Sequence, residues 1–126
     1  MTPAADPTYI LGDGKRLNDI LALAGTETAE LILRQMQVDL DGVARGLTAA
    51  LDSRDWTEIR AQTHVLISLA GTIGADRLHS AAIDVNTAAH DRAEDRVTSR
   101  AAPLLADLAH LRAALAVHKS PGKAAP

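Results

Sequence analysis

The chain has 126 residues, of which 47% are hydrophobic, and it carries a formal net charge of −3 and no cysteine. This length fits one domain with a single core, and the lack of cysteine excludes disulfides, thiolate metal sites and cysteine nucleophiles. The acidic balance and the 2% of aromatic residues argue against a nucleic-acid-binding protein.

No run of residues approaches the roughly 18 apolar positions of a membrane span, and the first seven residues contain no basic or apolar stretch. The sequence therefore predicts a soluble, cytoplasmic protein that binds no membrane. Ala, Leu, Ile and Val supply nearly all of the apolar content, and phenylalanine is absent. Such a core suits closely packed helices better than a sheet.

The N-terminal part is expected to hold a flexible arm and a short helix. Residues 1–8 contain two prolines and are predicted to form the arm. Gly12 and Gly14 would interrupt a helix that started earlier. Apolar spacing then predicts a helix over 15–24, with Gly25 as its stop.

The first long helix is predicted to begin at Thr26, which is a good N-cap residue. Its apolar positions recur every three or four residues, as in an antiparallel bundle, and are Leu33, Met36, Leu40, Val43, Leu47 and Ala50. Gly42 and Gly46 lie on one side of it, where they either permit close approach of another helix or merely cost stability; we favour close approach. Residues 51–55 are predicted to form a turn.

The second long helix carries a histidine on its polar side. Asp55 and Glu58 are expected to form a capping box at its start, and Gly74 to end it. Its apolar stripe consists of Ile59, Leu66, Leu69, Ala70 and Ile73. At about 100° per residue, His64 points away from this stripe and should face solvent.

Two more helices complete the predicted domain. The first starts at about residue 75 and buries Leu78, Ala82, Val85 and Ala89; residues 90–96 contain the next connection. The last helix buries Val97, Leu104, Leu108, Leu111 and Leu115. Pro103 should either kink this helix or lie in the first turn of a helix that begins near Ala101. Residues 119–126 are predicted to be a disordered tail.

Connections this short favour antiparallel neighbours. The expected fold is therefore all-α, an antiparallel up-down-up-down four-helix bundle over residues 9–118 with a short additional N-terminal helix.

The histidines do not have the spacing of a metal site. None recurs at three or four residues and no Glu-x-x-His occurs, so no metal and no cofactor is predicted. His79 is expected at the edge of its helix's apolar stripe, and His110 on the solvated surface. His118 lies near a helix C-terminus, where the helix dipole favours the protonated ring. Ser68 lacks partners for a hydrolytic triad, and we expect no enzyme.

The segment from His64 to Ala75, His-x-Leu-x-x-x-Ala-Gly-x-Ile-Gly-Ala, resembles the signature of histidine-containing phosphotransfer (HPt) domains of bacterial phosphorelays. Asp55-Trp56 is similar to the start of the same helix in that family, and the resemblance covers roughly residues 17–117. Ile67 and Ser68 stand where the family usually has Lys and Gly, and Asn86 stands where Glu is common.

The resemblance implies that His64 accepts a phosphoryl group from, and donates it to, aspartates of receiver domains in response regulators or hybrid kinases. The Mg²⁺ would belong to those partners, and the carrier would have no kinase activity of its own. Arg60, Ile67, Ser68 and Gly71 would surround His64 and dock the partner, with Ser68 and Gly71 leaving little bulk over the imidazole. A protein with His64 on a free surface can work as a monomer.

Two alternatives remain at this point: a degenerate HPt domain that docks receivers without relaying phosphate, and a structural bundle used for self-association. The substitution at position 67 bears on the first. A lysine there would bend back over the imidazole, whereas Ile67 offers apolar contact and no charge. Arg60, one turn before His64, lies on nearly the same side but leans away from it, and we expect only partial compensation.

Overall fold

The computed structural model describes residues 10–118, so the predicted arm (1–8) and tail (119–126) lie outside the described residues. Five helices lie within that range and no strand does, which confirms the all-α prediction. They are α2 (Lys15–Ala24), α3 (Thr26–Ser53), α4 (Trp56–Ile73), α5 (Asp76–His90) and α6 (Glu94–Val117).

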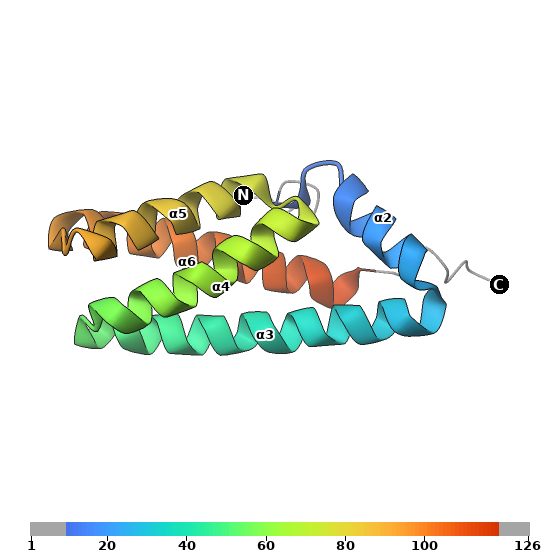
Figure 1. Cartoon of the computed structure of the whole chain (residues 1–126), viewed down its shortest axis with the longest axis horizontal. Helices are drawn as coiled ribbons and strands as arrows, with labels where there is room; N and C mark the ends of the chain where they lie inside the picture. The colour runs from blue at the N-terminus through green and yellow to red at the C-terminus, as the bar shows by residue number, and fades with distance from the viewer. Residues whose placement is uncertain (1–9, 119–126) are drawn as a thin grey trace, which may run out of the picture.

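The four longer helices lie lengthwise beside one another, and α2 lies near one end of the group (Figure 1). Helix α3 packs against α4 and α6, and α5 packs against the same two helices, so the four helices close a ring of contacts. Helix α2 packs on α3 and α4. The four helices therefore enclose a single hydrophobic core.

The apolar positions predicted from spacing form this core. Every predicted stripe residue of α3, α5 and α6 is buried. On α4, Ile59, Leu66 and Ala70 are fully buried and Leu69 is half-buried. The stripe of α4 therefore faces the other helices, as its periodicity indicates.

Alanine recurs every seven residues at Ala75, which directly precedes α5, and at Ala82 and Ala89 within α5, and all three side chains are buried. Ala70 on α4 is likewise fully buried. Helices α4 and α5 make the most extensive contact of any pair of helices in the described part of the chain. Small side chains permit this close approach because they hold the backbones apart less than leucine does.

Helix α3 is longer than predicted, since residues 51–53 continue it and the turn contains Arg54 and Asp55 alone. Leu51 is buried, and that burial favours the extra turn. Arg54 then takes a left-handed conformation with φ 54°, and its guanidinium donates to Leu51 O at 3.1 Å and to Glu94 Oε1 at 3.2 Å. These bonds hold a conformation that glycine adopts more readily.

Other helix ends agree with the prediction in part. The Asp55 side chain accepts from the Glu58 N–H at 3.1 Å, as predicted, but the Glu58 carboxylate accepts from Gln62. Helix α3 begins at Thr26, as predicted, but the residue in the N-cap position is Gly25, with φ 83°. No side chain caps this helix, so the prediction that Thr26 is the N-cap was wrong. A threonine cap requires the residue itself to lie outside the helix.

Helix α6 begins at Glu94 and runs through Pro103, so of the two alternatives for this proline the start near Ala101 was wrong. The connection, residues 91–93, lies within the predicted range 90–96. Val97, in the first turns of the helix, is fully buried. That burial favours helix upstream of the proline, and Pro103 itself is exposed.

Candidate functional site

His64 lies on the exposed side of α4, as its position relative to the apolar stripe predicted. Leu66 and Ala70, two and six residues on, are fully buried on the other side of the helix. The cap at Asp55 fixes the start of α4, and Gly74, with φ 81° in the left-handed region, ends it. The imidazole is therefore presented to solvent from a helix that is anchored at both ends and along its core side.

The helical turn between Arg60 and His64 is held from α5 by Asn86. Its side-chain amide donates to Arg60 O at 3.1 Å and to Thr63 Oγ1 at 2.9 Å. Thr63 is fully buried, and its hydroxyl donates in turn to Ile59 O at 2.8 Å. Since a helical N–H bonds the carbonyl four residues earlier, Arg60 O is also the acceptor position for the His64 amide. Asn86 thus fixes the backbone directly beneath the imidazole, a role that the sequence did not reveal.

The other residues expected around His64 differ in exposure. Ser68, one turn after His64, is exposed and leaves the outer face open. Ile67 is half-buried and packs against the core, so it contributes only part of its surface to the outside. Arg60 is exposed and lies one turn before His64.

Gly71 is not the open position that the sequence predicted. A Cβ placed on it would lie 3.1 Å from Cδ2 of His79, so the His79 ring covers this part of α4. The Gly71 carbonyl also accepts from Arg16 Nη1 at 2.7 Å. The reason is the close approach of α5, which the helical wheel of a single helix cannot show. The absence of a side chain at Gly71 accommodates a neighbour within the protein.

Charge is distributed unevenly around His64. Glu58 is the single carboxylate of α4, and it accepts from Gln62, whose side chain lies against Gly46 of α3. On α5, the row that contains the two contacts with α4 consists of Asp76, His79, Ile83, Asn86 and His90. Asp76 is its single carboxylate, and it lies at the end of α5 near Gly71, 3.8 Å from Arg16. The surface formed by Arg60, His64 and Ser68 of α4 and by Asn86 of α5, called the His64 face below, contains no carboxylate.

The carboxylates of α5 are engaged elsewhere. Asp84 pairs with Arg100 of α6 at 2.9 Å, and Asp76 lies 3.8 Å from Arg16 of α2. Both pairs are exposed, so each is worth little to stability. Their effect on the site is to keep two negative charges on the sides of α5 that α6 and α2 occupy.

The histidines of α6 differ from their predictions. His110 is half-buried, and its Nδ1 is buried without a hydrogen-bond partner among residues 10–118, so the prediction of a solvated surface residue was wrong. At His118, burial lowers the pKa, whereas the helix-dipole argument predicted that protonation would be favoured. Its Nε2 lies 3.1 Å from Asn18 Oδ1 of α2. For both histidines, burial in the folded protein differs from what the position of the residue on its own helix predicted.

Among residues 10–118, no group of three or more His, Asp or Glu side chains could hold a metal ion. Within the same range, no helix has both the length and the apolar character needed to cross a membrane. The chain matches no protein-family model, and no curated protein or solved structure matches it.

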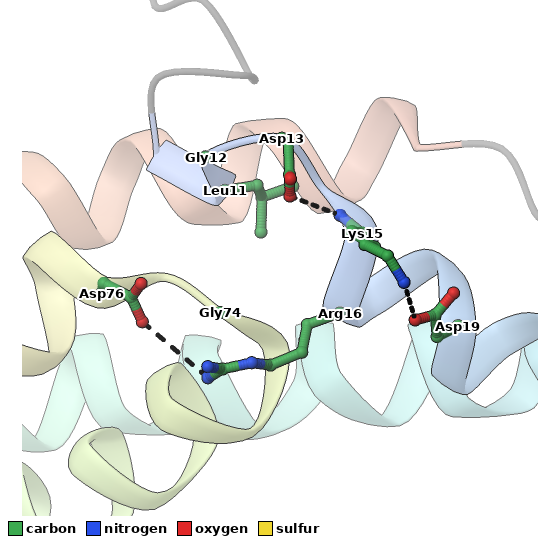
Figure 2. A pocket seen from close by; sticks show the side chains of 8 residues that line it. All are labelled: Leu11, Gly12, Asp13, Lys15, Arg16, Asp19, Gly74 and Asp76. Carbon is green, nitrogen blue, oxygen red and sulfur yellow. Dashed lines mark hydrogen bonds and ion pairs between the residues drawn. The ribbon is translucent and has the colours of Figure 1, made fainter.

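A pocket of about 490 Å³ lies at the end of the protein where α2 meets the α4–α5 connection, and Figure 2 shows its lining. The Asp13 carboxylate accepts from the Lys15 N–H at 2.9 Å, and the Lys15 ammonium pairs with Asp19 at 3.0 Å. Arg16 reaches across towards Asp76 (Figure 2). The charged groups of this pocket are therefore largely paired with one another. His64 is not part of its lining.

Proposed function

We propose that this protein is a phosphocarrier of a bacterial two-component phosphorelay, in which His64 accepts and donates a phosphoryl group. The observation that carries the proposal is the exposed imidazole of His64 on a well-anchored helix whose single carboxylate, Glu58, accepts from Gln62. A phosphorylated partner brings negative charge to this side of α4, where Arg60 is the one charged residue beside His64. The resemblance of residues 64–75 to the HPt signature gives the same assignment.

The chemistry requires little from the carrier. The unprotonated ring nitrogen of His64 attacks the phosphorus of an aspartyl phosphate, the P–O bond to the carboxylate breaks, and the electron pair leaves on the aspartate. The reverse step returns the group to a second aspartate. The transfer uses the imidazole of His64 and no other nucleophile of the carrier.

The partners in this proposal are receiver domains of response regulators or hybrid kinases, which supply the acceptor aspartate and the Mg²⁺. The carrier has no kinase activity, works as a monomer in the cytoplasm, and has the up-down-up-down arrangement of α3, α4, α5 and α6 with α2 added at one end. The ring of contacts among the four helices and their short connections support that arrangement. Ile67 and Ser68 form part of the docking surface.

The test is phosphoryl transfer from a radiolabelled phospho-receiver, followed by acid treatment. Phosphohistidine is acid-labile, so the wild type should carry label that acid removes, and His64→Gln should carry none. His90→Gln is the matched control, because His90 is also exposed and lies on the α5 row beside α4. It should label as the wild type does.

Other outcomes separate the alternatives. Receiver binding without label in the wild type indicates a degenerate domain that only docks. Neither binding nor label, together with self-association, indicates a structural bundle. Full labelling of His64→Gln would show that His64 is not the acceptor.

A further inference from the structure

Arg60 stands out among the cations of this protein because its charge is uncompensated and close to His64. It is the one Lys or Arg of α4, and it is exposed. Among the hydrogen bonds and ion pairs of residues 10–118, none involves its guanidinium. Two other arginines that contact α4 or α5 are engaged: Arg16 binds Gly71 O, and Arg100 pairs with Asp84.

The geometry of the helix places Arg60 and His64 together. Residues four apart lie on one side of a helix with their Cβ atoms about 5–6 Å apart. Helical side chains lean towards the N-terminus, so the His64 imidazole leans over the turn that starts at Arg60. Arg60 leans the same way, so its long, flexible side chain has to turn back to reach a group bound to His64. The amide of Asn86 holds Arg60 O at 3.1 Å, which fixes the backbone from which the arginine side chain extends.

Other groups near the His64 face are less suited to neutralise a phosphoryl group on the imidazole. Ile67 carries no charge and is half-buried. The His79 ring packs against Gly71, two turns beyond His64, so it is held away from the turn that contains Arg60. The carboxylate of Glu58, which could compete for the guanidinium, accepts from Gln62 at 2.7 Å.

We propose that the Arg60 guanidinium binds the phosphoryl group carried by His64 and prolongs the life of the phosphohistidine. The inference rests on the proposed function, because it concerns the phosphorylated form of the same residue. A guanidinium presents two parallel N–H donors that match two phosphoryl oxygens, and such charge-assisted bonds are stronger than neutral ones.

The cation also slows hydrolysis of the phosphohistidine. In that reaction water attacks phosphorus, the P–N bond breaks, and the electron pair goes to the ring nitrogen, which leaves more easily when the ring is protonated. A positive charge nearby disfavours protonation of the ring. Arg60 therefore keeps the phosphoryl group on His64 for transfer and lowers its loss to water.

The test uses phosphoramidate as a small phosphoryl donor, so that no partner protein contributes to the result. The full chain is labelled, the donor is removed, and the first-order loss of phosphohistidine is followed by ³¹P NMR. Wild type is compared with Arg60→Gln, Arg60→Lys and the matched control Arg34→Gln, an exposed arginine of α3. Thermal unfolding of each variant verifies that the fold is intact.

Arg60→Gln should lose label roughly two- to fivefold faster than wild type, the range expected for an exposed charge pair. Arg60→Lys should lose label at a rate between those of wild type and Arg60→Gln, since lysine keeps the positive charge but lacks the two parallel N–H donors. Arg34→Gln should match wild type. The difference should shrink at 1 M salt, where charges are screened over about 3 Å.

Equal lifetimes for Arg60→Gln and wild type would overturn the inference and leave the proposed function in place. An equal acceleration in Arg34→Gln would also overturn it, because the effect would then be general. If wild type takes label neither from phosphoramidate nor from a phospho-receiver, the proposed function fails and the inference fails with it.

Discussion

Helix α4 packs against α3 on one side and against α5 on the other. At each interface a glycine leaves room for a polar side chain, but the hydrogen bonds at the two interfaces differ. On the α3 side, Gln62 lies against Gly46, where a Cβ would come within 2.7 Å of its amide nitrogen. Gln62 bonds Glu58 within its own helix. On the α5 side, His79 lies against Gly71, and Asn86 also bonds the backbone and a buried hydroxyl of α4. The α5 interface therefore fixes the turn that bears His64, whereas the α3 interface supplies packing alone.

The largest difference between the two interfaces is expected on removing their amide side chains. Asn86→Ala should lower the free energy of unfolding by about 1–3 kcal/mol, because it removes two hydrogen bonds to α4, one to Arg60 O and one to the buried Thr63 hydroxyl. Gln62→Ala removes a bond within one helix and should change stability by about 0.5 kcal/mol at most. Urea unfolding measures both. Equal losses would show that the α5 side has no special role.

The two glycines should respond with different magnitudes to alanine. Gly46→Ala should raise the free energy of unfolding by up to about 1 kcal/mol, because alanine favours helix and the end of the Gln62 side chain can swing away. Gly71→Ala should gain less, since its Cβ would press on the stiffer His79 ring. Denaturant midpoints give the stabilities, and the NMR shifts of His79 report the displacement. An equal gain at both positions would mean that His79 moves as easily as Gln62.

Adding charge on the α5 side of α4 should have a smaller effect. In the Arg60→Gln background, Ile67→Lys should lengthen the phosphohistidine lifetime by roughly two- to fivefold, because a lysine three residues on leans back over the imidazole. Receiver affinity should fall if Ile67 contributes apolar contact. Val65→Lys, which is partly exposed but points about 100° away from His64, is the control and should leave the lifetime unchanged. If Ile67→Lys changes neither the phosphohistidine lifetime nor the receiver affinity, the residue at position 67 has no part in either.

The smallest expected effect lies at neither interface. Burial lowers the pKa of His118, so its folded-state pKa lies below the unfolded value. The folded protein therefore resists protonation of this ring, and stability should fall as pH decreases through the unfolded pKa towards the folded one. His118→Gln should flatten this part of the stability profile, measured by urea unfolding between pH 5 and about pH 8. An unchanged slope would assign the dependence to another group.

Periodicity and glycine positions predicted most of the fold. The bounds of α2 were predicted in full, and those of α4 followed from Asp55 and Gly74. These signals are local, because a cap or a left-handed glycine acts within one turn of chain. The prediction that Gly42 and Gly46 permit close approach of another helix was wrong for Gly42, where a Cβ would meet nothing within 4 Å. At Gly46 the nearest atoms belong to the Gln62 side chain of α4.

The predictions from sequence were wrong where contacts with another helix determine the local structure. The extra turn of α3 depends on burial of Leu51 and on the contact of Arg54 with Glu94 of α6. At the candidate site, the wheel predicted the exposure of His64 and Ser68. It could not predict that His79 covers Gly71, because that contact depends on how closely α5 approaches.

The alanines buried along α5 have a consequence for conformational entropy. A buried long side chain loses rotamer freedom on folding, at a cost of up to about 2 kcal/mol, whereas alanine has none to lose. Ala75, Ala82 and Ala89 are therefore buried without that cost. They also have no alternative rotamers, so the packing at these three positions has a single side-chain arrangement.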